Sequence, residues 1–189
     1  MKNTLLICLF VFAALSCKAQ NIIPVEDFFD YQNEIPDGTY IKDINNVLNK
    51  FTGTWLGSYD NKNYEIVVEE VVYQSQIRTS LTYDQLHLRY KITDANGTIL
   101  LNTLPLPDDN DYVAMGQYVN PSGAYQLDYA GYEYDCGQSG TLFIKTFNDN
   151  TQMKLYLYLG ESPYNEDDCP NGFAEQEFPT NSQMLLTKQ

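Results

Sequence analysis

The stretch FTGTWLG, residues 51–57, decides the fold that this sequence predicts. It holds Trp55, the only tryptophan of the chain, whose large apolar ring carries one N–H that needs a partner. Gly53 lets another backbone or ring approach closely where a strand bends, and the threonines on either side favour the pleated conformation. We therefore expect Phe51, Gly53 and Trp55 to form a structural motif that closes one end of a β-barrel, without touching a ligand.

After this stretch, short segments alternate between apolar and polar residues and are separated by turns. The turn Asp94-Ala95-Asn96-Gly97, for example, carries the Asn-Gly pair of a tight hairpin. This series of short strands indicates a barrel or a sandwich, and a closed barrel is favoured because it leaves no exposed edge. We predict an all-β chain whose domain, residues 39–189, is an antiparallel up-and-down barrel of about eight strands. The predicted strands are residues 52–59, 64–73, 85–93, 98–104, 112–119, 124–133, 141–147, 152–159 and 182–187.

One short helix is expected just before the barrel, where it can plug one end. Its apolar residues recur every three or four positions, which places them on one face of a helix. These residues are Ile41, Ile44, Val47 or Leu48, and Phe51. The polar leader before the helix, residues 20–38, is expected to be irregular.

A short helix followed by Gly53-Thr54-Trp55 on the first strand resembles the lipocalin and calycin proteins, whose first strand carries a Gly-x-Trp motif. The resemblance implies a lipocalin-like barrel in which the tryptophan packs across one end and a basic residue of the last strand lies over it. Lys188 or Lys154 would take the place of that basic residue. The middle and C-terminal motifs of the family are not visible.

The first half of the chain also resembles a group of uncharacterised, exported, lipoprotein-like bacterial proteins. The resemblance rests on SCKAQ at residues 16–20, IKDINN at residues 41–46 and FTGTW at residues 51–55. It implies export and no known activity.

Residues 1–19 have the order of an export signal: a lysine, an apolar run over residues 5–15, and then small residues. The run is too short to span a bilayer. Two interpretations of its end stay open, because Cys17 could become the lipid-bearing first residue of a lipoprotein or the chain could be cut between Ala19 and Gln20. Both place the protein in the periplasm or at the outer membrane or cell surface, and only a lipid on Cys17 would attach it to a membrane.

Two cysteines remain in the folded part, since Cys8 and Cys17 belong to the signal. In an exported chain we expect Cys136 and Cys169 to form a disulfide. Closing a loop of roughly 30 residues would stabilise the fold by about 3–4 kcal/mol on the chain-entropy model. A metal site is not expected, because neither cysteine has a CxxC partner and His87 is the only histidine.

The chain is strongly acidic, with a formal net charge of −14. Without Lys2 and Lys18 of the signal region the sum becomes 9 − 25 = −16. A protein this acidic repels phosphate backbones, which excludes nucleic acid as the expected partner.

No set of residues in the sequence indicates a catalytic site. His87 shares a strand face with Arg89 and Lys91, and we expect that face to be solvated, so a Ser-His-Asp arrangement is not predicted. The acidic residues select no pair for acid–base chemistry, and the two acidic turns do not match a calcium-binding loop. These carboxylates include Glu69, Glu70, Asp128, residues 108–111, Glu161 and residues 166–168. We therefore expect no enzyme, no cofactor and no metal.

Tyrosine is unusually abundant, with sixteen residues. If the leucines of residues 152–159 face the core, Tyr156 and Tyr158 form an outer stripe that could stack on sugars or contact a protein. If the tyrosines point inward, they line a cavity, and a third interpretation is that they only form cross-strand pairs. Further along the chain, one strand face carries Tyr125 and Tyr129, and the other face carries Tyr132 and Tyr134.

Two functions are therefore expected for a non-enzymatic envelope protein that is exported or lipid-anchored. The first is the binding of a small apolar ligand inside the barrel. The alternative is an interaction module that contacts an envelope protein or a glycan through a tyrosine-rich outer surface.

Overall fold

The computed structural model describes residues 20–31, 35–75, 77–78, 80–160, 164, 166–167 and 169–189. The predicted export signal, with the lipidation candidate Cys17, lies outside these residues. No helix in the described part of the chain is both long and apolar enough to cross a bilayer.

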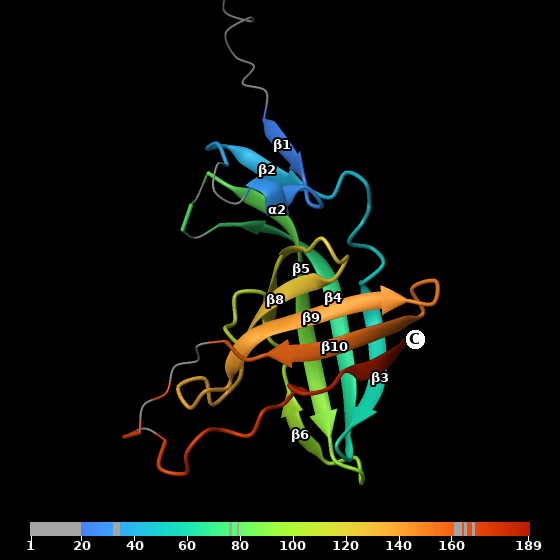
Figure 1. Ribbon diagram of the computed structural model, residues 1–189, viewed down its shortest axis with the longest axis vertical. Helices are drawn as coiled ribbons and strands as arrows, with labels where there is room; N and C mark the ends of the chain where they lie inside the picture. Colours follow the sequence, from blue (N-terminus) through green and yellow to red (C-terminus); the bar gives the residue numbers. More distant parts are fainter. Residues whose placement is uncertain are drawn as a thin grey trace, which may run out of the picture.

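The predicted barrel is confirmed. Each strand of the ring pairs antiparallel with the next, the first pairs with the last, and β5 pairs with β7 to complete the circle (Figure 1). Residue alternation explains the closure, because one face of every strand is apolar and only a closed ring buries all of these faces together. The ring consists of β3 (Gly53–Tyr59), β4 (Lys62–Gln74), β5 (Thr82–Thr93), β7 (Ala114–Val119), β8 (Tyr125–Ala130), β9 (Ser139–Phe147), β10 (Gln152–Tyr158) and β11 (Met184–Lys188).

Strand β5 is longer than the barrel wall needs and has three different neighbours along one edge. Its first residues pair with β2 (Thr39–Lys42), its middle pairs with β7, and its last residues pair with β6 (Ile99–Asn102). Figure 1 shows the consequence, with β2 at one end of the barrel and β6 at the other.

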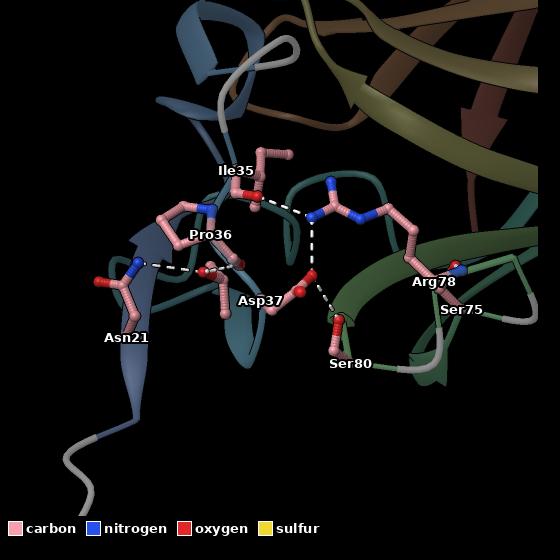
Figure 2. Close-up of polar contacts among 8 residues, drawn as sticks. Asn21, Ile35, Pro36, Asp37, Ser75, Arg78 and Ser80 are labelled. Atoms are coloured by element: carbon pink, nitrogen blue, oxygen red, sulfur yellow. Dashed lines mark hydrogen bonds and ion pairs between the residues drawn. The ribbon is translucent and has the colours of Figure 1, made fainter.

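The leader is part of the sheet, so the prediction that residues 20–38 are irregular is wrong. Strand β1 (Asn21–Pro24) pairs in parallel with β2 and carries the leader to the barrel end. Asp37 fastens the second half of the leader, since it accepts hydrogen bonds of 3.0 Å from Arg78 and from Ser80 (Figure 2). The Arg78 guanidinium also holds the pKa of the Asp37 carboxyl below its usual value.

The barrel is preceded by one short helix, but the predicted position of this helix is wrong. The helix α2 is Phe28–Tyr31, within the leader. Residues 43–51 form turns instead, because the Asp43 carboxylate accepts the N–H groups of Val47 and Leu48 at 2.8 Å. Asn46 has a φ of 56°, which a right-handed helix does not contain.

One end of the barrel is built around Trp55. Trp55 is fully buried, and its Nε1 donates a 2.8 Å hydrogen bond to the carbonyl of Phe51. Lys188 pairs with Trp55 across β3 and β11, and its Nζ lies 5.2 Å from the centroid of the indole. Gly53 has a φ of 117°, and a Cβ there would lie 3.0 Å from Cε of Lys188. Lys188 is therefore the basic residue over the tryptophan.

The other end is filled by Phe178, from the long connection between β10 and β11. Its ring lies 4.8 Å from that of Tyr90 and 5.4 Å from that of Tyr129, centroid to centroid. The carboxylate of the preceding Glu177 accepts hydrogen bonds from both tyrosine hydroxyls, at 2.6 Å from Tyr129. Burial is the main reason why the pKa of each of these tyrosines is raised. Both barrel ends are thus closed by aromatic side chains.

Candidate functional site

An open cleft of about 720 Å³ lies on the outer face of the barrel wall formed by β5, β7 and β8. The register places the side chains of Gln85, Met115 and Asp128 outside, because Met115 pairs with His87 and Asp128, which alternate with the inward-facing leucines of the same strands. Tyr129, which points inward, also contributes to the lining. Tyrosine dominates the aromatic part of the lining, with Tyr73, Tyr112 and Tyr134 among the lining residues. The polar part includes Gln85, Asp111 and Asp128.

Next to the cleft, the outer face of β5 carries a buried polar network. The prediction that this face is solvated is therefore wrong. His87 is fully buried and Arg89 is 6% exposed. The side-chain amide of Gln85 lies 2.8 Å from Nε2 of His87. Nδ1 of His87 lies 3.4 Å from the Asp108 carboxylate without a well-directed hydrogen bond, so Asp108 acts mainly as a nearby charge.

Arg89 covers this face by holding the chain between β6 and β7 against it. Its Nε donates to the carbonyl of Leu106 at 2.9 Å, one terminal nitrogen donates to Glu69 at 2.9 Å, and the other pairs with Asp108. The Arg89 guanidinium is the main reason why the pKa of the Asp108 carboxyl is lowered. These bonds hold the segment that carries Tyr112, a lining residue of the cleft. Through Asp108, the acidic turn at residues 108–111 thus has a structural role.

The opposite wall of the cleft is the loop between β8 and β9. Gln138 organises this loop, since its side chain accepts a hydrogen bond from the N–H of Glu133 at 2.9 Å and donates one to the carbonyl of Glu175 at 2.8 Å. The predicted disulfide is confirmed, because Cys136 and Cys169 are bonded, with an S–S distance of 2.11 Å. Tyr134 thus sits on a loop that is fixed from two sides.

The two walls meet through a pair of tyrosines. The ring of Tyr112 stacks on that of Tyr132 at a centroid distance of 3.9 Å and an interplanar angle of 17°. Tyr132 and Tyr134 are 45% and 43% exposed, so both remain open to solvent. The cleft therefore offers aromatic surface next to carboxylate and amide groups, which suits a ligand that has both apolar faces and hydroxyl groups.

The remaining tyrosines divide as their strand faces predict. Tyr125 and Tyr129 point into the barrel, where each is at most 3% exposed. Tyr158 is exposed on the outer face of β10, while Tyr156 stacks on Phe143 of β9. The tyrosines therefore lie on both faces of the sheet: Tyr125 and Tyr129 belong to the packed core, Tyr156 forms a cross-strand aromatic pair, and Tyr158 is exposed.

The barrel interior is occupied by the side chains of the core. The large, fully buried side chains include Phe51, Trp55, Tyr90, Tyr125 and Phe178, and the ring strands other than β3 add smaller aliphatic residues. The expectation of an apolar ligand inside the barrel stays a prediction. This packing does not favour it, and the cleft beside β5, β7 and β8 and two smaller grooves, at β9–β10 and at β3–β5, open on the outside of the barrel.

The described residues contain no group of three or more histidine, cysteine or acidic side chains that could hold a metal ion. Asp108 is occupied by Arg89. Of the other acidic turn, residues 161 and 168 lie outside the described part of the chain.

The buried position of His87 leads to a first testable prediction. Burial lowers the pKa of its imidazole below the ordinary value of 6.5. The unfolded chain then binds more protons than the folded chain just below pH 6.5, so the free energy of unfolding falls as the pH drops through this window. The charges that face the ring are Asp108, Arg89 and Glu69.

NMR titration of the single histidine in untagged protein checks the prediction, and its midpoint should lie below 6.5. Urea unfolding of the His87→Gln variant should lack the component of pH dependence that His87 contributes between about pH 5 and 6.5. A midpoint at or above 6.5 would contradict the account of a desolvated, neutral imidazole.

A family model described as a family of unknown function (DUF6705) matches residues 1–189. No curated protein and no solved structure matches the chain.

Proposed function

We propose that this chain, which belongs to the family of unknown function DUF6705, is an exported envelope protein that binds a neutral glycan in its outer tyrosine cleft. The observation that carries the proposal is the cleft itself, where Tyr73, Tyr112 and Tyr134 line the same space as Gln85, Asp111 and Asp128. Its volume of about 720 Å³ lies within the range of small-molecule sites.

A sugar fits this chemistry better than a protein surface does. A pyranose ring presents C–H groups on its faces, which pack on tyrosine rings, and hydroxyl groups at its edge, which donate to carboxylate and amide oxygens. A folded partner would need a broad surface with a well-packed centre, whereas these groups lie in a concave cleft.

Export is the second part of the proposal. The Cys136–Cys169 disulfide is typical of an oxidising compartment, and the order of residues in the first part of the sequence is that of an export signal. We place the protein in the periplasm or at the cell surface, with Cys17 as the residue that would carry a lipid.

The binding proposal predicts the effect of removing single rings. Titration with a panel of neutral hexose oligosaccharides should identify a binder, and Tyr112→Ala or Tyr134→Ala should weaken its binding about tenfold, as expected for the loss of an anchoring aromatic side chain. Isothermal titration calorimetry measures the change.

Tyr158→Ala is the matched control, because this tyrosine is 61% exposed but lies outside the cleft. Its binding should equal that of the unchanged protein. Equal losses in all three variants, or no loss in the two cleft variants, would overturn the cleft as the site. If the cleft binds a protein and none of the sugars displaces it, the partner is that protein and the glycan proposal is wrong.

A further inference from the structure

A second surface, on the outer face of β9 and β10, carries an arrangement of charges that the barrel itself does not need. Lys145 and Lys154 lie directly opposite each other in the antiparallel pair, and both are exposed. Like charges in this position destabilise a sheet. The chain has 25 acidic residues against 11 lysines and arginines, so two facing lysines are unexpected in its composition.

Neither lysine forms a salt bridge with a described acidic residue, although Lys62, Arg78, Arg89 and Lys91 all do. Nζ of Lys145 donates one hydrogen bond, to the carbonyl of Ser122 at 2.7 Å. Nζ of Lys154 lies 5.6 Å from the ring centroid of Phe147. An ammonium group has three donors, so both lysines keep hydrogen-bonding capacity for a ligand.

The lysines border a groove of about 450 Å³ whose lining includes Phe143, Phe147 and Tyr156. Phe143 and Tyr156 are a cross-strand pair whose rings stack at 4.9 Å with an interplanar angle of 5°. Asn120 and Gln183 add amide groups to the same lining. The groove therefore combines aromatic surface, amides and two cations.

We propose that this groove binds an anionic sugar, meaning a pyranose that carries a carboxylate. The lysines pair with the carboxylate, the aromatic rings pack against the sugar ring, and the amides meet its hydroxyl groups. The negative charge of the rest of the protein does not prevent this, because at physiological salt charges beyond about 8 Å are largely screened. The proposal is independent of the tyrosine cleft, since the two sites share no lining residue.

The test uses three probes of similar size: a trisaccharide of galacturonic acid, a trisaccharide of galactose, and a trimer of aspartate. Calorimetry on the Tyr112→Ala/Tyr134→Ala background, in which binding at the tyrosine cleft is weakened, should show that the uronic acid binds at least tenfold more tightly than the neutral sugar and the peptide. The Lys145→Gln/Lys154→Gln double variant should lose at least tenfold in affinity for the uronic acid, and about 500 mM salt should weaken binding to the unchanged protein.

Lys42→Gln is the matched control, because Lys42 is also exposed and its Nζ also lies 5.6 Å from an aromatic ring, that of Tyr40. It should leave the affinity unchanged. The double variant should unfold at the same or higher urea concentration than the unchanged protein, because it relieves a like-charge pair. If the aspartate trimer binds as tightly as the uronic acid, the ligand is not specifically a sugar. If the uronic acid does not bind, or binds equally well without the two lysines, the groove is not its binding site.

Discussion

Replacing Trp55 by alanine is expected to lower the free energy of unfolding by about 3–5 kcal/mol, the usual cost of removing a buried aromatic side chain. Trp55 has no exposed surface, and the side chain also satisfies the carbonyl of Phe51. Alanine would leave a cavity at the closed barrel end and would remove this hydrogen bond. Urea unfolding followed by circular dichroism measures the change without using tryptophan fluorescence.

Two further variants separate the parts of this effect. Trp55→Phe keeps much of the apolar volume and loses the N–H, so its cost should be smaller than that of alanine. Lys188→Met removes the charge over the indole and should cost about 0.5–1 kcal/mol, as for other partly exposed cation–π contacts. Leu56→Ala, at a site on the same strand that is 41% exposed, should change stability by less than about 0.5 kcal/mol. A cost below about 1 kcal/mol for Trp55→Ala would show that the barrel end does not depend on this residue.

The barrel was predictable because the alternation of apolar and polar residues can be read within each strand, without knowing its neighbours. Apolar alternation along β5, for example, places Leu86, Leu88 and Tyr90 on one face, and all three are buried in the interior. The three-to-four spacing that predicted the helix misplaced it, because Ile44 fits this spacing but is 53% exposed. Spacing identifies a common face and does not show whether another element covers it.

The cleft could not be predicted, because it depends on which segments cover which strand faces. Alternation correctly placed His87 on the outer face of β5, but the segment that buries it is held there by contacts of Arg89 with residues 17 and 19 positions away. Tyr112 and Tyr132 come from different connections and meet only in the folded chain. The available signal was the abundance of tyrosine, which indicates aromatic contacts without naming the partners.

Phe178 illustrates a further limit. It lies in a connection that the sequence presents as a polar loop, yet its ring is 1% exposed and closes the barrel. The contacts that bury it come from Tyr64, Tyr90 and Tyr129, on three different strands. A single apolar residue among polar ones has no period, so only the three-dimensional arrangement shows its role.

The Cys136→Ser/Cys169→Ser double variant is expected to lose about 4 kcal/mol of stability on the chain-entropy model, because the bond closes a loop with a sequence separation of 33 residues. The barrel should still form, since neither cysteine belongs to a ring strand and Phe178 keeps its own core contacts. Circular dichroism should therefore stay native-like while the urea midpoint falls. The unchanged protein should show the same fall after reduction with dithiothreitol, and the double variant should not respond to the reductant.

The same variant also connects the disulfide to the proposed glycan site. Tyr134 lies two positions before Cys136, on the loop that the bond joins to the connection after β10. Loss of the bond frees this wall of the cleft and should weaken glycan binding. Uronic acid binding at the β9–β10 groove should stay unchanged, because its lining residues lie on or next to ring strands, and Gln183, on the connection after β10, directly precedes β11. A double variant with unchanged stability would show that non-covalent contacts are enough to hold the loop, among them those of Gln138 and the hydrogen bond from the N–H of Ala174 to the carbonyl of Cys136.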